Sequence, residues 1–125
     1  MRQIHSMNTK PEIKVRSLLH KMGYRFRIHK INLPGKPDVV LSKYKKVIFV
    51  HGCFWHRHQS CIEASHPKTN SAYWEEKITK NMIRDRKNEA ELLKLGWEVI
   101  IIWECELKGQ EETISEFLRN RIFYQ

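Results

Sequence analysis

Two apolar runs constrain the fold of this chain more than any other feature. They are Val47–Val50 and Trp97–Trp103, and the segment between them carries a helical pattern over residues 72–95 that Gly96 ends. Strands that are apolar along their whole length are buried on both faces, which happens when helices cover both sides of a sheet. Neither run is long enough to span a membrane. The sequence therefore predicts an α/β fold in which both runs are buried strands and Val47–Val50 is central.

Shorter segments complete the expected order of elements. Thr9 can cap a helix, with Pro11 in its first turn and Glu12 completing a capping box. We expect this helix to end at Gly23, strands over residues 24–28 and 38–41, and a last helix over residues 113–122. The order α-β-β-β-α-β-α predicts a mixed β-sheet flanked by helices on both faces. A single domain over residues 9–125 would follow a short arm of residues 1–8.

The charge of the chain limits its partners. It has 23 Lys and Arg against 14 Asp and Glu, a formal net charge of +9, which favours a polyanionic partner, nucleic acid before an anionic membrane. The N-terminus has no signal-peptide pattern, so we expect a cytoplasmic protein that does not enter the membrane. Its three cysteines would then be reduced thiols or metal ligands.

Metal-binding residue types concentrate in His51–Cys61, HGCFWHRHQSC. Cys53, His58 and Cys61 have the spacing C-x4-H-x2-C, and Cys105 follows the last predicted strand. A structural zinc site needs four nitrogen or sulfur ligands, which these residues would supply if the strand at 97–103 ends beside the central strand. The zinc would hold in place a loop too polar to pack by itself. The alternative is that the cysteines are ordinary buried thiols.

Candidate metal ligands and candidate general bases lie at the ends of the predicted strands. Asp38 opens one strand and His51 follows the next, and a carboxylate with a backbone carbonyl can hold a hydrated Mg²⁺ that orients a water at a phosphodiester. A turn or cap carboxylate is the alternative for Asp38. Once His58 is assigned to zinc, His51 and His56 are left as candidate general bases. Asp85 is a candidate partner to fix a tautomer.

Three aromatic residues form a further group. Phe54 and Trp55 are adjacent inside the polar loop, and Trp74 shares a face of the long predicted helix with Asn81 and Asp85. In a basic protein such residues can stack on bases or wedge between them. Packing in the core is the alternative.

Together these blocks resemble the very short patch repair endonucleases, the Vsr family, bacterial enzymes that nick DNA beside a T:G mismatch. The matching blocks are LPGKPDVV at 33–40, VIFVHGCFWHRH at 47–58, YWEEKITKN at 73–81, RDR at 84–86 and LGWEVIIIWECEL at 95–107. The resemblance implies a restriction-endonuclease-like fold. It also implies a cut on the 5′ side of the mispaired T, which arises when 5-methylcytosine deaminates.

The resemblance further implies how a catalytic Mg²⁺ is bound. Asp38 and the backbone carbonyl of Val50 would be its ligands, and Glu12 would reach its water shell. The family usually has threonine where this chain has Val50, a change that leaves a carbonyl ligand unaffected. His51 would lie near the metal-bound waters and the phosphate.

The remaining site residues also match the family. His56 corresponds to the proposed general base and Asp85 to the carboxylate that orients it. The structural Zn²⁺ set corresponds to Cys53, His58, Cys61 and Cys105, with Cys61 assigned by its order rather than by strict spacing. The aromatic wedge that enters from the major groove corresponds to Phe54, Trp55 and Trp74. The family usually has a longer basic segment before the position of Thr9 that clamps the DNA.

The leading hypothesis is therefore a monomeric, Mg²⁺-dependent endonuclease that nicks double-stranded DNA at T:G mismatches and carries a structural zinc. The family also implies contacts with other mismatch-repair proteins, and association with the nucleoid when bound to DNA. One alternative is a zinc-stabilised DNA-binding module without catalysis, which would have no use for Asp38, His56 and Asp85 together. Another is a restriction-type nuclease acting on paired sites, which would not need Phe54 and Trp55 in an exposed loop.

Overall fold

The structure, a computed structural model, describes residues 9–28, 32–54, 56 and 71–123. The described part contains three α-helices, three strands and two short 3₁₀ turns. In chain order these are α1 (Lys10–Lys21), β1 (Val39–Leu41), η1 (Ser42–Tyr44), β2 (Lys46–His51), α2 (Ser71–Lys94), β3 (Glu98–Trp103), η3 (Glu104–Leu107) and α3 (Glu111–Phe123). None of the helices found among these residues has the length and apolar character needed to cross a membrane.

The strands form one mixed sheet in the order β1-β2-β3. β1 runs antiparallel to β2, with Val39 opposite Ile48, and β2 runs parallel to β3, with His51 opposite Trp103. The predicted central position of the Val47–Val50 run is confirmed. Because β2 and β3 are parallel and adjacent, they end side by side at the same edge of the sheet.

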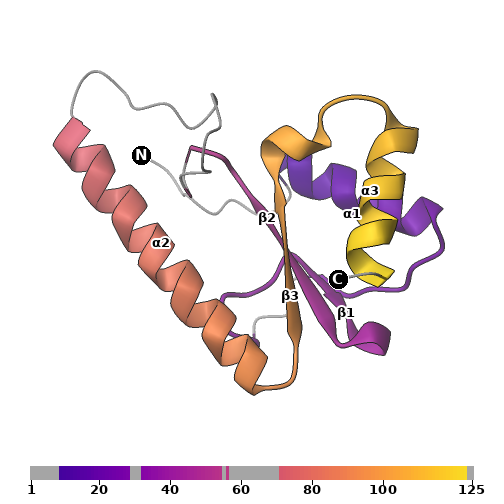
Figure 1. Ribbon diagram of the computed structural model, residues 1–125, viewed down its shortest axis with the longest axis horizontal. Helices are drawn as coiled ribbons and strands as arrows, with labels where there is room; N and C mark the ends of the chain where they lie inside the picture. Colours follow the sequence, from indigo (N-terminus) through magenta and orange to yellow (C-terminus); the bar gives the residue numbers. More distant parts are fainter. Residues whose placement is uncertain (1–8, 29–31, 55, 57–70, 124–125) are drawn as a thin grey trace.

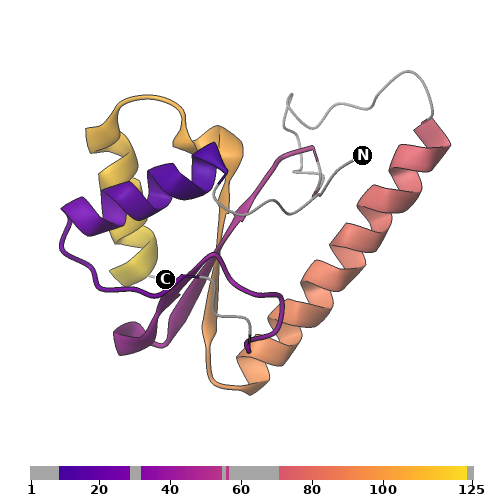
Figure 2. The same cartoon turned by 180° about the vertical axis from the view of Figure 1, so that it is seen from behind.

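Helices cover both faces of the sheet, as predicted. Figures 1 and 2 show α1 and α3 together on one face and α2 on the other. Side chains alternate between the two faces along each strand, as the pleat requires. The larger core lies on the α1 and α3 side and contains Val15, Leu18, Leu19, Val39, Leu41, Ile48, Ile100, Ile102, Leu107, Ile114, Leu118 and Ile122. The smaller core, on the α2 side, contains Val40, Val47 and Leu92.

The start of α1 has the predicted Thr9 cap and the predicted proline, whereas the contacts seen for the Glu12 side chain are with Arg16 and Asp38 rather than with the Thr9 backbone. The Thr9 hydroxyl accepts a hydrogen bond from the backbone N–H of Glu12 at 3.4 Å, and Pro11 occupies the first turn. Gly23, with φ of +87°, lies just beyond the end of the helix. The cap therefore fixes the backbone of Glu12 at the first turn of α1.

The strand predicted over residues 24–28 is wrong. Only Arg27 pairs with the sheet, through two backbone hydrogen bonds with Val40 of 3.0 and 2.8 Å. Tyr24 and Phe26 pack against the larger core, whereas Ile28 is exposed. The alternation in this segment therefore reflects core packing for Tyr24 and Phe26 only, and it does not require a hydrogen-bonded ladder.

Candidate active site

Two groups of polar side chains meet where β2 ends. One group joins Asp38, just before β1, to Glu12 of α1. The other joins His51 and His56, from the end of β2 and the loop after it, to Asp85 of α2. The sheet therefore brings together residues from both of its faces.

Asp38 is held by the sheet. Its backbone N–H donates to the carbonyl of Ile48 at 3.0 Å, and its carboxylate Oδ2 accepts the N–H of Val50 at 2.6 Å. Strand pairing stops here, because β1 begins at Val39. The Asp38 side chain therefore accepts the Val50 N–H in place of a backbone carbonyl. The carboxylate is thus fixed against β2 at a position set by the strand register.

The surroundings of Asp38 disfavour its charge. Burial, together with the charge of Glu12 and a hydrogen bond to its side chain, raises the pKa of Asp38 to about 7. The Val50 N–H and the charge of Arg16 act in the opposite direction, and burial is the largest effect. Two carboxyl groups in one largely buried place favour either a shared proton or a bound cation.

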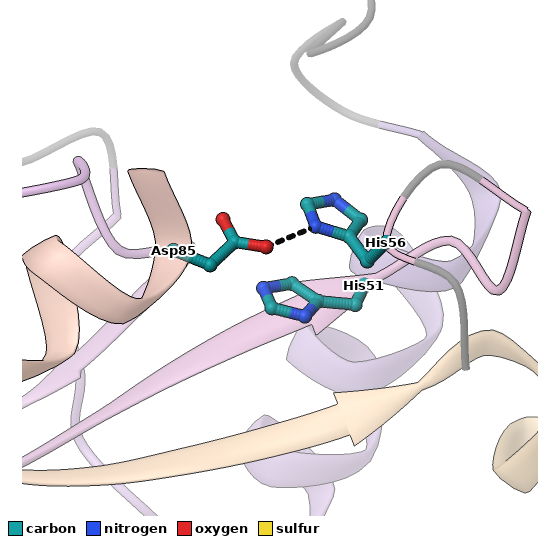
Figure 3. A group of neighbouring side chains, drawn as sticks. All are labelled: His51, His56 and Asp85. Atoms are coloured by element: carbon teal, nitrogen blue, oxygen red, sulfur yellow. Dashed lines mark hydrogen bonds and ion pairs between the residues drawn. The ribbon is translucent and has the colours of Figure 1, made fainter. Parts of the chain in front are cut away.

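The histidine group is tightly ordered, as Figure 3 shows. His56 Nδ1 lies 2.5 Å from Asp85 Oδ2, and the His56 ring stacks on the His51 ring with centroids 3.8 Å apart and planes 5° from parallel. Both histidines are buried, and His51 also meets the edge of Trp103 at 5.1 Å. Packing and hydrogen bonding therefore leave little rotational freedom to either ring.

This geometry suits proton transfer. A neutral His56 that donates its Nδ1 proton to Asp85 has a lone pair on Nε2, which can accept a proton. His51, His56 and Asp85 also have the composition of a small metal site, with ligand atoms within 4.8 Å of one another. Ligands of one metal ion must converge, however, and parallel stacked imidazoles direct their lone pairs along parallel planes. The arrangement therefore suits acid–base chemistry better than it suits the binding of one metal ion by all three residues.

The aromatic residues are partly brought together. Phe54 meets Trp74 of α2 edge to face at 5.7 Å, and both are half-buried. Tyr73, which is exposed, packs on Trp74 at 5.0 Å. Trp55 lies outside the described residues. The contact places an aromatic surface at the N-terminal end of α2, next to the loop that carries His56.

Two of the four candidate zinc ligands lie at neighbouring strand ends. His51 and Trp103 are paired, and Cys53 and Cys105 each follow two residues later. Cys53 is buried and Cys105 is half-buried. The predicted requirement that the two strands end side by side is met. The other two candidates, His58 and Cys61, lie outside the described residues.

Two residues near the site were given no role by sequence reasoning, although Asn81 was placed on the same helix face as Asp85. Asn81 is 1 % exposed on the face of α2 that carries Asp85, and its side-chain oxygen accepts a hydrogen bond from Arg84. Arg16 lies one helical turn after Glu12 and its charge acts on Asp38. The spacing of Arg16 and Glu12 gives a sequence signal for the pair, but only the fold shows that it faces Asp38.

The fold is similar to that of a domain of known structure. Among solved structures, the chain is similar to the homing endonuclease I-Bth0305I catalytic domain, with a TM-score of 0.59 and 20% sequence identity over 91% of this chain and 94% of that one. This likeness concerns the fold, and it supports the expected mixed sheet with flanking helices.

Sequence comparison gives the family. A family model described as DNA mismatch endonuclease Vsr matches residues 1–62. The type II nicking enzyme V.NmeAIP of Neisseria meningitidis is 56% identical over 95% of this chain and 86% of its own length. The DNA mismatch endonuclease Vsr of Escherichia coli is 45% identical over 98% of this chain and 78% of its own. The chain belongs to the DNA mismatch endonuclease Vsr family.

Proposed function

We propose that this protein nicks one DNA strand on the 5′ side of the T in a T:G mismatch, by Mg²⁺-dependent hydrolysis. Membership of the family makes it a DNA mismatch endonuclease, with DNA as its partner. The observation that carries the proposal is structural: the carboxylates of Glu12 and Asp38 and the His56–Asp85 pair flank the same strand end. Val50 donates its N–H to Asp38, and the next residue of β2, His51, stacks on His56.

The carboxylate group fits a divalent cation. A cation would offset the unfavourable burial of Asp38 beside Glu12, and hard divalent ions prefer oxygen ligands. In a strand the N–H and C=O of one residue point to the same side, so the carbonyl of Val50 points toward the side on which its N–H binds Asp38. Asp38 and the Val50 carbonyl would hold Mg²⁺, with Glu12 at its water shell. When bound, Mg²⁺ supplies Lewis-acid stabilisation of charge on the phosphate.

The histidine group would handle the proton. His56 would accept a proton at Nε2 from the attacking water while the water oxygen bonds to phosphorus and the leaving oxygen departs. Asp85 would stabilise the imidazolium that forms and keep Nε2 directed outward. His51, stacked beneath His56, would contact the phosphate.

Two further sets of residues would recognise the mismatch and hold the loop after β2 in place. Phe54, Trp55 and Trp74 would wedge into the mismatched step, because such a step unstacks at lower cost than a paired one. A structural Zn²⁺ on Cys53, His58, Cys61 and Cys105 would hold the wedge and the base on one loop. We propose a single nuclease domain over residues 9–125 that acts as a monomer.

A nicking assay tests the proposal. A T:G duplex should be nicked in Mg²⁺ but not in EDTA, and Asp38→Ala should abolish the nick by removing the carboxylate that β2 orients. Glu116→Ala, which removes an exposed carboxylate on α3, is the matched control and should cut normally. Equal cutting of T:G and fully paired duplexes would refute mismatch specificity. Tight mismatch binding without any nick would instead favour the non-catalytic DNA-binding module.

A further inference from the structure

Arg16 is folded back over the first turn of α1. Its Nη2 lies 3.9 Å from Glu12 Oε1, and its Nε donates to the backbone carbonyl of Glu12 at 3.4 Å. Both side chains are only 14 % exposed. The guanidinium is therefore held against the Glu12 turn from two directions.

Two other ion pairs in the described part of the chain are far more exposed than this one. Lys80 and Glu76 of α2 have the same four-residue spacing, but their side chains are 72 % and 69 % exposed. The pair between Lys21 of α1 and Glu111 is 59 % and 61 % exposed. Exposed pairs of this kind contribute little because solvent screens them. The Arg16–Glu12 pair is shielded from that screening.

The charge of Arg16 also reaches Asp38. Arg16 lowers the pKa of Asp38 whereas Glu12 raises it, so the three groups form one electrostatic unit. An ionised Asp38 would repel Glu12, and the Glu12 side chain would be able to turn toward solvent if Arg16 were missing. Arg16 opposes both tendencies by neutralising part of the charge and by holding the Glu12 carboxylate in place.

We propose that Arg16 is a positioning residue for the nicking reaction, acting through Glu12. It holds the Glu12 carboxylate beside Asp38, so that both oxygen-bearing groups are already aligned when the metal and the DNA bind. This inference rests on the proposed roles of Glu12 and Asp38. It assigns Arg16 no contact with the DNA.

A double-mutant cycle tests the inference. Single-turnover nicking rates on a T:G duplex, with protein in excess, are compared for wild type, Arg16→Gln, Glu12→Gln and the double variant. Arg16→Gln should slow nicking by about tenfold to a hundredfold, the range expected for misplacement of a group at an active site. The double variant should be no slower than Glu12→Gln, because Arg16 then has no carboxylate to position. DNA affinity should change little.

Two control variants complete the design. Lys21→Gln removes a positive charge from an exposed pair on the same helix and should nick at the wild-type rate. Arg16→Lys keeps the charge but loses the fork of donors, so it should nick at an intermediate rate. If Arg16→Gln does not fold, Arg16→Lys replaces it in the double-mutant cycle.

The outcomes separate the inference from the proposed function. If the effects of Arg16→Gln and Glu12→Gln multiply, Arg16 does not act through Glu12 and the inference is overturned. If Arg16→Gln weakens DNA binding as much as it slows nicking, Arg16 is a phosphate contact and the inference is also wrong. If Glu12→Gln alone nicks at the wild-type rate, the proposed role of Glu12 fails and the inference fails with it.

Discussion

At the residue scale, Asp38 illustrates a conflict between stability and function. The fold buries this carboxyl group next to another acid, where its charge is unfavourable. Apolar residues already fill the core on both sides of the sheet, so Asp38 is not needed to form it. A bound cation would offset this cost, so the burial of Asp38 agrees with the proposed metal site.

This burial predicts a pH dependence of stability. Asp38 titrates near 3.8 in the unfolded chain and at about 7 in the folded protein, so the folded state binds the proton more tightly. The free energy of unfolding should therefore fall as pH rises from about 4 to 7. Between pH 5 and 8, Asp38 should account for at most about 3 kcal/mol of the loss in metal-free protein. Urea unfolding in EDTA at several pH values measures this loss in the free energy of unfolding.

Asp38→Asn isolates this effect from the other titrating groups. An asparagine has no proton to lose in this range, so the variant should show a shallower decrease across the same pH values. Equal decreases in wild type and Asp38→Asn would mean that Asp38 is not protonated in the folded, metal-free protein.

At the scale of elements, the loop before β1 lies directly against α2. Gly35, with φ of +76°, approaches Asn88 so closely that a Cβ at this position would lie 2.9 Å from the Asn88 side-chain nitrogen. The same loop leads to Asp38, while α2 carries Asp85 three residues before Asn88. This contact therefore helps to set the distance between the two groups of the site.

Substitution of Gly35 separates backbone strain from packing. Gly35→Ala should cost about 1–2 kcal/mol for the left-handed backbone, plus the clash with Asn88. Gly23→Ala is the matched control, because Gly23 has φ of +87° and a methyl group added there would have nothing within 4 Å. Asn88→Ala in the Gly35→Ala background should narrow but not close the difference between the two alanine variants, because it removes the amide nitrogen at 2.9 Å and leaves the Asn88 Cβ 3.0 Å from the added methyl group. Urea unfolding measures the stability of the wild type and of these three variants, and equal losses for Gly35→Ala and Gly23→Ala would rule out a tight contact.

Local signals predicted the elements well where they were strong. The long helix was predicted over 72–95 and spans Ser71–Lys94, because a glycine stops it and its pattern is long. The strand over residues 24–28 was wrong, because only Arg27 meets a sheet partner. Alternating side chains show which residues face the core, but strand pairing depends on a partner that lies elsewhere in the chain.

The candidate site was less predictable because its contacts join distant segments. Helical spacing suggested Asp85 as a partner for a histidine, and the family resemblance named His56. The stacking of His51 on His56 depends on how the loop turns after β2, which no spacing shows. The contact between Glu12 and Asp38 arises only when α1 packs on the sheet.

At the scale of the whole molecule, the two halves of the site depend on different cores. Glu12 lies on α1, which packs with α3 on the larger core of twelve buried residues. Asp85 lies on α2, whose side of the sheet has the smaller core of Val40, Val47 and Leu92, and α2 also buries Ile78 outside that core. Elements with fewer buried apolar contacts open locally before the whole protein unfolds.

Nicking should therefore be lost on heating before the fold is. As temperature rises, α2 would loosen first and Asp85 would separate from His56, while the carboxylates beside β1 stay in place. Activity measured during a temperature ramp should decline at a lower temperature than that at which the amides of α1 lose their protection from exchange. Coincident loss of activity and structure would contradict this order. Slower amide exchange in α2 than in α1 would contradict it as well.

Because the helices sit on opposite faces of one sheet, heat tolerance and metal chemistry can change independently in this protein. Substitutions that fill space beneath α2 would extend the working temperature range without touching the groups proposed to hold the metal. Substitutions beneath α1 would alter the proposed metal site while leaving the His56–Asp85 pair in place. The central strand is the exception, since any change there reaches both halves at once.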